Sequence, residues 1–246
     1  MIMSLVGLAG FIDAVAGGGG LITVPTYIAF GVPPEFILGT NKLVSTSGTS
    51  FATFRYLRSG IINFREIIIP VIVALVSSVI GAWLTTHFLS VRGMMIILLV
   101  IIPIIFVINI RKSFGLVNIK NNLTTTKIAL RLILVAGIIG TYDGFFGPGT
   151  GAMLIIALVS FIGLDLREGA AYGRVLNFAS NVGALSYFLI DGRVMWSIGL
   201  PAIVAGMTGN WLGSGYMLRS PPKAVKPILW LVLGLLMFKC IYDLCW

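Results

Sequence analysis

The chain has 246 residues, of which 58% are hydrophobic and 10% are charged, and its mean hydropathy is +1.04. These values lie outside the range of soluble domains and predict an all-α polytopic membrane protein with almost no domain outside the bilayer. The net charge of +9 resides mainly in the predicted loops between helices, where basic residues orient membrane proteins. We therefore expect a lipid bilayer around this chain and no nucleic-acid partner.

The first predicted element covers residues 1–31, an apolar segment interrupted by Asp13 and by four consecutive glycines from Gly17 to Gly20. An aspartate and a helix-breaking glycine cluster are costly in lipid unless they line a cavity or a binding site. The glycines divide the segment into two pieces of about 12 residues, each too short to span a bilayer. We expect a broken helix, which either crosses in two pieces or enters the membrane and returns.

Three longer helices are predicted next, over residues 36–57, 65–89 and 92–110, and a polar linker occupies residues 113–126. The pattern then repeats. Residues 128–163 contain Asp143 followed by Gly147-Pro148-Gly149-Thr150-Gly151, and further helices are expected over 166–189, 193–218 and 224–243. We therefore divide the chain into a first repeat at 1–112, a cytoplasmic linker at 113–126 and a second repeat at 127–246.

A constant spacing of 132 residues supports the repeat, since it relates Gly31 to Gly163, Lys42 to Arg174, Gly60 to Gly192 and Gly81 to Gly213. If both broken segments return to the side from which they start, each half crosses the membrane three times and the two halves are inverted. This arrangement puts most lysines and arginines on the cytoplasmic side, in agreement with the positive-inside rule. Through-spanning segments give a weaker bias, so inverted repeats are the preferred prediction.

Three motifs resemble a known transporter family: Gly10-Phe-Ile-Asp-Ala-Val-Ala-Gly-Gly-Gly-Gly-Leu-Ile-Thr-Val-Pro25, Leu38-Gly-Thr-Asn-Lys-Leu43 and Tyr142-Asp-Gly-Phe-Phe-Gly-Pro-Gly-Thr-Gly151. They are similar to motifs of the TauE/SafE family, also called the toluene-sulfonate uptake permease family, and in particular of its YfcA-like branch. The resemblance covers nearly the whole chain and implies a membrane carrier for a small, often sulfur-containing anion. It implies neither the particular anion nor the direction of transport. Only nine residues precede Gly10, fewer than the resemblance leads us to expect.

Each glycine cluster precedes an apolar helical segment, whose first backbone N–H groups lack partners within the helix and carry the positive end of the helix dipole. Such helix ends bind anions. We predict that the two ends converge on the substrate together with polar residues of the helix after each break, the full set being Gly17, Gly18, Gly19, Gly20, Asn41, Lys42, Gly147, Gly149, Thr150, Gly151, Arg174 and Asn177. The alternative is that the glycines only allow close helix packing.

Lys42 and Arg174 lie well inside apolar helices, where cations are rare without a pairing or functional reason. Each belongs to a helix with one polar stripe, formed by Asn41, Ser45 and Thr49 in the first half and by Arg174, Asn177 and Asn181 in the second. The two cations contact the substrate, snorkel to the interface or neutralise Asp13 and Asp143. In the last case we expect Asp13→Asn to restore the stability that Lys42→Met loses. The aspartates themselves are either structural in this way or take up protons during transport.

These features predict a secondary transporter that moves a small anion across a prokaryotic cytoplasmic membrane, with protons or sodium as coupling ions. The resemblance implies that the anion contains sulfur, as sulfite or an organosulfonate does. A passive anion channel is the alternative, because the same helix ends could select anions without alternating access. We expect no enzyme, since a single histidine, His87, cannot supply a multi-histidine metal site and neither glycine cluster precedes Lys-Ser or Lys-Thr. We expect no cofactor and no metal, and the sequence leaves open association into a homo-oligomer.

Overall fold

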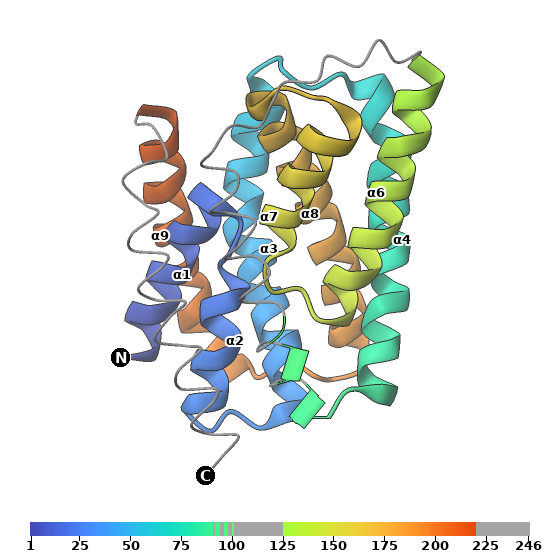
Figure 1. Cartoon of the computed structure of the whole chain (residues 1–246). Helices are drawn as coiled ribbons and strands as arrows, with labels where there is room; N and C mark the ends of the chain where they lie inside the picture. The colour runs from blue at the N-terminus through green and yellow to red at the C-terminus, as the bar shows by residue number, and fades with distance from the viewer. Residues whose placement is uncertain (91, 94–95, 98–99, 101–124, 220–246) are drawn as a thin grey trace.

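The computed structural model describes residues 1–219 apart from 91, 94–95, 98–99 and 101–124. In this part of the chain the elements are helices and no strand occurs. Figure 1 labels them: α1 (Ile2–Ala16), α2 (Gly20–Ala29), α3 (Pro34–Arg58), α4 (Phe64–Phe88), α6 (Thr125–Phe145), α7 (Thr150–Ala157), the π-helical turn η1 (Leu158–Ile162), α8 (Leu166–Ile190) and α9 (Trp196–Arg219). The all-α fold class is confirmed.

The long helices α4 and α8 begin at a side-chain cap. Asn63 precedes α4 and its side chain accepts a hydrogen bond from the amide of Arg65 at 3.1 Å. Asp165 and Glu168 form a capping box at the start of α8, in which each side chain accepts from the other residue's amide. The predicted helices at 36–57, 65–89, 166–189 and 193–218 are thereby confirmed as α3, α4, α8 and α9. The predicted linker at 113–126 and the helices at 92–110 and 224–243 lie mostly or wholly outside the described residues.

Both predicted breaks are present. The chain leaves α1 at Gly17, which has φ of 74°, and it reaches α7 through Gly147 and Gly149, with φ of 91° and 86°. These left-handed conformations suit glycine because it lacks a Cβ atom. Apart from Gly147, the described glycines with positive φ form three pairs separated by 132 residues: Gly17 with Gly149, Gly31 with Gly163, and Gly60 with Gly192. The spacing found in the sequence therefore recurs in the backbone conformation.

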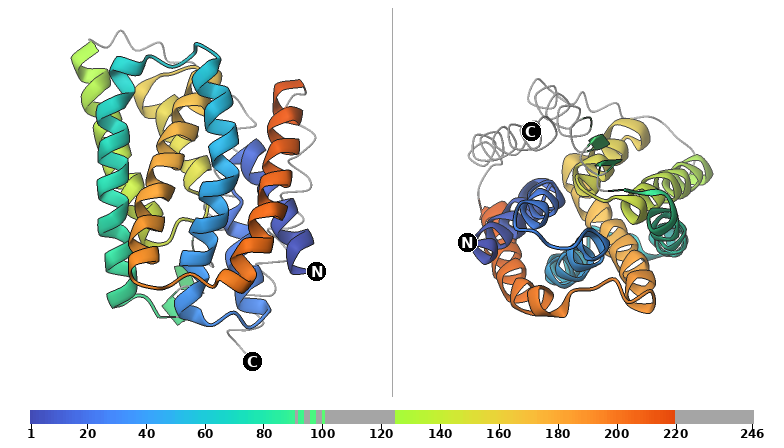
Figure 2. Two further views of the ribbon diagram at one scale, coloured as in Figure 1. Left: turned by 180° about the vertical axis from the view of Figure 1, so that it is seen from behind. Right: turned by 90° about the horizontal axis from the view of Figure 1, so that it is seen from below.

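The helices form one bundle in which α3 and α8 lie side by side at the centre (Figures 1 and 2). Helix α1 packs against α9 on one side of this central pair, and α6 packs against α4 on the other. Each outer pair thus joins one helix from each half of the sequence. The polar side chains of the molecule's interior come mainly from α3 and α8, between two apolar clusters centred on α1–α3 and on α6–α8.

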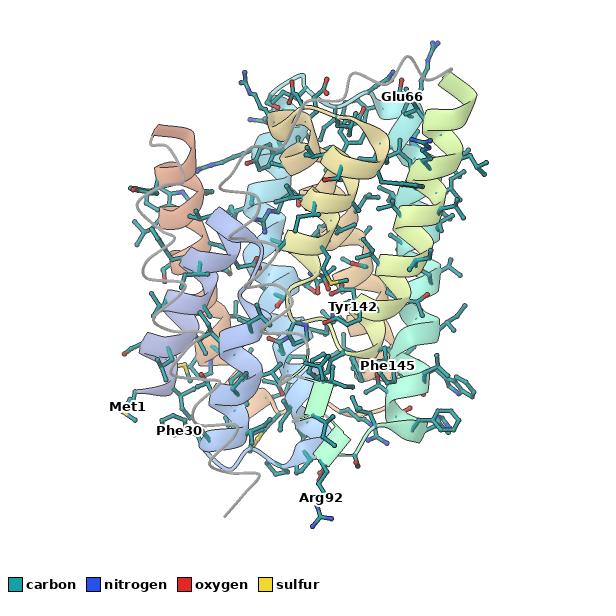
Figure 3. All side chains as sticks on the ribbon, in the orientation of Figure 1. Met1, Phe30, Glu66, Arg92, Tyr142 and Phe145 are labelled. Atoms are coloured by element: carbon teal, nitrogen blue, oxygen red, sulfur yellow. The ribbon has the colours of Figure 1, made fainter. Side chains whose placement is uncertain are left out.

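The directions of the helices differ between the two halves. In Figure 1 α3 and α9 run toward the upper end of the bundle, and α4 and α8 run toward the lower end. Helix α1 starts at the lower end and α2 returns to it, so that Met1 and Phe30 lie at the same end in Figure 3, opposite to Glu66. Helix α6 starts at the upper end, and α7 with η1 returns there. Among the described residues, α1 to α4 thus each run opposite to their counterparts in the second half, α6 to α9 (Figure 1).

The outer surface of the bundle is apolar, as a lipid environment requires. Large hydrophobic side chains are exposed at helical spacing on α4 (Ile68, Ile72, Val76 and Ile80) and on α6 (Leu130, Leu134 and Ile138). Among the described residues, Phe64–Phe88 and Ile128–Phe145 are long and apolar enough to cross a membrane by composition alone. Helices α3 and α8 have the length of a span, but their inward faces carry the polar side chains of the site described below.

Candidate functional site

The two helix breaks meet inside the bundle, backbone against backbone. The amide of Ala152 in α7 donates a hydrogen bond to the carbonyl oxygen of Gly17 at 3.2 Å. A methyl group placed on Gly17 would lie 2.7 Å from the Cα atom of Gly151, and one placed on Gly20 would lie 3.0 Å from the Cα atom of Pro148. Larger side chains cannot fit where the breaks touch. The glycine clusters therefore bring segments about 130 residues apart in sequence into direct contact.

A small polar cavity of about 20 Å³ lies at this meeting point. It has room for about one water molecule, so an anion of the size of sulfite fits only when the surrounding helices move apart. The lining residues come from both halves: Asp13, Gly17, Gly20, Asn41, Lys42, Ser45, Asp143, Gly147, Gly149, Thr150, Gly151, Asn177 and Asn181. The structure thus gathers most of the site residues predicted from the sequence. Gly18, Gly19 and Arg174 are not part of the lining, although Gly19 and Arg174 contact Asp13 directly.

Two helix N-termini point backbone amides toward this cavity. In α7 the amides of Thr150, Ala152 and Met153 donate to backbone carbonyls, whereas that of Gly151 has no acceptor among the described residues. In α2 the amides of Leu21, Ile22 and Thr23 donate to the carbonyls of Gly18 and Gly19. Gly20 and Gly151 both line the cavity. The positive ends of two helix dipoles at one cavity form a setting that favours an anion.

Lys42 forms a fully buried ion pair with Asp143 (2.8 Å between Nζ and Oδ1), and both side chains are 2% exposed. The ammonium group also donates to the Oδ1 atom of Asn181 at 2.9 Å. The second carboxylate oxygen of Asp143 accepts a hydrogen bond of 2.6 Å from the hydroxyl of Ser180. Both oxygens of this carboxylate are therefore occupied by donors from the central helices α3 and α8.

Arg174 forms the corresponding ion pair with Asp13 (3.0 Å between Nη1 and Oδ2). Its Nη2 atom donates to the backbone carbonyls of Asp13 and Ala14 at 2.6 and 3.0 Å. Arg174 thus caps the last turn of α1, where the carbonyl of Asp13 also accepts from the amide of Gly17 at 2.8 Å. Among the described residues, the other oxygen of Asp13 accepts only from the amide of Gly19, at 3.2 Å.

Both ion pairs join one half of the sequence to the other. The sequence-based expectation that Lys42 is neutralised by Asp13 is therefore wrong, because α6 of the second half carries the carboxylate nearest to Lys42. Snorkelling is also wrong for both cations, since Lys42 is 2% and Arg174 5% exposed. The sequence alone does not show which aspartate pairs with which cation, because the two halves place them in similar surroundings. The packing of α6 against α4 and α8 determines that Asp143 pairs with Lys42.

Several polar residues of the site were not predicted. Thr23 of α2 donates to the Oδ1 atom of Asn41, the hydroxyl of Tyr142 donates to the carbonyl of Pro148 at 2.7 Å, and Ser180 holds Asp143. Single hydroxyl residues are common in membrane helices, so none of them stands out in the sequence. Ser180 had one usable signal, because it precedes Asn181 on the stripe that begins at Arg174.

Two further cavities flank the site. One of about 10 Å³ lies between α1 and α9 and is lined by Asp13, Gly19, Ser45 and Asn210, among others. The other, of about 300 Å³, lies at the lower end of the bundle among Pro34, Leu38, Thr85, Phe188 and Arg193. Leu38 and Phe188 are 4% and 1% exposed and separate this larger cavity from Asn41 and Lys42, one helical turn further along α3. Among the described residues no group of three His, Cys, Asp or Glu side chains could hold a metal ion.

Comparison with known proteins identifies the family. A sequence profile described as sulfite exporter TauE/SafE matches residues 2–240. The chain is 35% identical to the probable membrane transporter protein ORF9 of Sinorhizobium over 96% of its own length and 89% of that protein, and 33% identical to a probable membrane transporter protein of Haemophilus influenzae over 97% and 92%. It is 32% identical to the probable membrane transporter protein YfcA of Escherichia coli over 96% and 87%. No solved structure matches the chain significantly. The chain belongs to the sulfite exporter TauE/SafE family, in its YfcA-like branch.

Proposed function

We propose that this membrane protein is a secondary carrier that binds a small sulfur-containing anion, such as sulfite or an organosulfonate, where the two helix breaks meet. The observation that carries the proposal is the convergence of two helix N-termini on one buried cavity, with Gly20, Gly151 and the ammonium group of Lys42 in its lining. Discontinuous helices with their positive ends near the bilayer midplane are the usual anion sites of carriers. The family profile adds the expectation of a sulfur oxyanion.

We propose further that the halves are inverted repeats, with the upper end of Figure 1 in the cytoplasm of a prokaryotic cell. The opposite directions of corresponding helices and the three pairs of positive-φ glycines support the repeat. Arg55, Arg58, Arg65, Arg131 and Arg167 belong to helix ends at the upper end, whereas Arg92 and Arg193 belong to the lower end. An excess of basic residues marks the cytoplasmic side.

A carrier is favoured over a channel by the closure of the cavity. The central cavity of about 20 Å³ offers no continuous path for an anion, and the apolar side chains of Leu38 and Phe188 separate it from the larger cavity at the lower end. Because each outer helix pair contains one helix from each half, rocking of the halves against each other would open the site to one end at a time. Each ion pair then tethers a broken helix of one half to a central helix of the other.

The test is transport of anions by the purified protein in liposomes. Sulfite, sulfoacetate, taurine, thiosulfate and toluenesulfonate are offered outside, and uptake is measured with and without unlabelled anion trapped inside. A carrier gives saturable uptake that is accelerated by internal anion. Non-saturating flux without this counterflow would identify a channel instead, and chemical turnover of the sulfur compound without translocation would identify an enzyme.

A further inference from the structure

The four buried charges of the site cancel. Lys42 and Arg174 each donate to a carboxylate and to neutral oxygen atoms, and no net charge is left for a substrate. An anion that reaches the cavity meets Asp13 and Asp143 in its lining, and repulsion between like charges is strong where water is excluded. Neutralisation of one carboxylate by a proton would give the site one positive charge, so an anion and a proton would bind together.

The two carboxylates differ in exposure and in hydrogen-bond partners. Asp143 is 2% exposed, and its two oxygens accept from Lys42 and from Ser180. Asp13 is 15% exposed, and its Oδ1 atom accepts only the long bond from the Gly19 amide. The residue that corresponds to Ser180 at the spacing of 132 is Gly48, which carries no hydroxyl. Asp13 thus lacks the hydroxyl donor that Asp143 has in the equivalent ion pair.

Asp13 also lies between two cavities, whereas Asp143 lines only the central one. The second cavity extends between α1 and α9 to Asn210, whose Oδ1 atom is buried without a hydrogen-bond partner. Its volume of about 10 Å³ is close to what one water molecule needs, and a buried water requires polar partners such as this oxygen and a carboxylate. Asp13 therefore has a second small cavity beside it that could hold one water molecule.

The surroundings of Asp13 contain few other groups that could titrate. Arg174 of α8 is in direct contact, and Lys42 of α3 faces the same cavity. Among the described residues of the remaining neighbours, α2 contributes Tyr27, α7 contributes none, and α9 contributes Tyr216 and the terminal Arg219. The only carboxylate that shares the cavity is Asp143. These observations single out Asp13 as the candidate proton acceptor.

We infer that Asp13 is the coupling residue of the carrier, which takes up one proton from water when the anion binds. This inference rests on the proposed function. The proton adds to Oδ1 and converts the carboxylate to a neutral acid, which weakens the bond from Arg174 and leaves the positive charge of that guanidinium uncompensated beside the cavity. The anion then binds to a site of charge +1. Asp143 keeps its ion pair with Lys42 throughout.

Binding of toluenesulfonate to the purified protein tests the inference, because a sulfonate does not itself titrate in the working range. Calorimetry in two buffers of different ionisation enthalpy counts the protons taken up per anion. The wild type should take up one proton, and its affinity should rise about tenfold for each unit by which the pH falls. In Asp13→Asn the proton uptake and the pH dependence of binding should both disappear. The matched control is Lys42→Met/Asp143→Asn, which removes the other ion pair without changing the net charge of the site and should keep the proton uptake and the pH dependence, whatever its affinity.

Variants that keep a carboxylate test the assignment in case the asparagine variants do not fold. Asp13→Glu should shift the midpoint of the pH dependence, and Asp143→Glu should leave it in place. A shift in Asp143→Glu alone, or proton uptake that persists in Asp13→Asn, would overturn the assignment to Asp13. Binding without any proton uptake by the wild type would overturn coupling itself. If the wild type binds and transports none of the anions, the proposed function fails, which is a separate result from a carrier that works without Asp13.

Discussion

Removal of the Lys42 side chain should destabilise the protein more than any other single change at the site, because its carboxylate partner is only 2% exposed. Lys42→Met leaves Asp143 buried with only the hydroxyl of Ser180 as a donor. We expect a loss of about 3 to 5 kcal/mol in stability, as is usual when one member of a buried ion pair is removed. Thermal unfolding of the detergent-solubilised protein measures the loss.

The double variant Lys42→Met/Asp143→Asn should recover most of this stability, since no buried charge then remains at the pair. The matched control is Lys42→Met/Asp13→Asn, which removes the carboxylate of the other ion pair and should not recover it. Recovery by the control in place of the double variant would contradict the crossed pairing. Anion affinity measured on the stable double variant separates the contribution of Lys42 to binding from its contribution to folding.

The hydroxyl of Ser180 donates to the second oxygen of Asp143. Its removal should cost less stability than removal of one member of the ion pair. Ser180→Ala removes a hydrogen bond to a buried charged group, which costs about 2 kcal/mol. Ser186→Ala is the control on the same helix, because its hydroxyl is exposed and donates only to the carbonyl of Val182. We expect a change within about 0.5 kcal/mol for the control. Equal unfolding temperatures of the two variants would contradict the role of Ser180.

At the scale of the element, the contact between the two helix breaks contributes to stability separately from the left-handed conformation of the glycines. Two glycines distinguish the two contributions. Gly17 and Gly31 have nearly the same φ, 74° and 70°, but an added methyl meets the backbone of Gly151 at Gly17 and nothing within 4 Å at Gly31. Gly31→Ala should cost about 1 to 2 kcal/mol for the left-handed conformation. Gly17→Ala should cost about 1 to 3 kcal/mol more through overpacking.

The variants Gly17→Ala and Gly31→Ala should also differ in transport activity. Gly31→Ala leaves the site intact and should transport anions at the rate of the wild type, whereas Gly17→Ala pushes α7 away from the break in α1 and should abolish uptake into liposomes. Unfolding temperature and uptake are measured on the same preparations. A Gly17→Ala protein that transports normally would show that the contact of the breaks is not part of the site.

The breaks and the long helices were predictable because their signals are local. Glycine clusters interrupt apolar runs at Gly17–Gly20 and around Gly149, and the caps at Asn63 and Asp165 fix where α4 and α8 begin. The pairing of the charges was not predictable, because it depends on which helix of one half packs against which helix of the other. The unpaired oxygen of Asn210 was equally hidden, since nothing in the sequence distinguishes it from a surface asparagine of a membrane helix.

For the whole molecule, the proposed inverted arrangement assigns opposite membrane faces to two equivalent turns. Ser59 follows α3 and Asp191 follows α8, each beside a glycine with φ near 70° and separated by the spacing of 132. With Cys240 and Cys245 replaced by serine, Asp191→Cys should react with an impermeant maleimide added to intact cells. Ser59→Cys should react only after the membrane is permeabilised. The reverse labelling would contradict the orientation, and labelling of both turns from one side would contradict the inversion.

The crossed ion pairs also have a consequence for biosynthesis. The first half leaves the ribosome with Asp13 and Lys42 already in place, but Arg174 follows Asp13 by 161 residues, and Asp143 arrives only with α6. Until the second half is inserted, both charges sit in the membrane without their final partners, where such groups are costly. We therefore expect a chain that is truncated before α6 to be less stable in the membrane than the complete chain, in which both ion pairs can form.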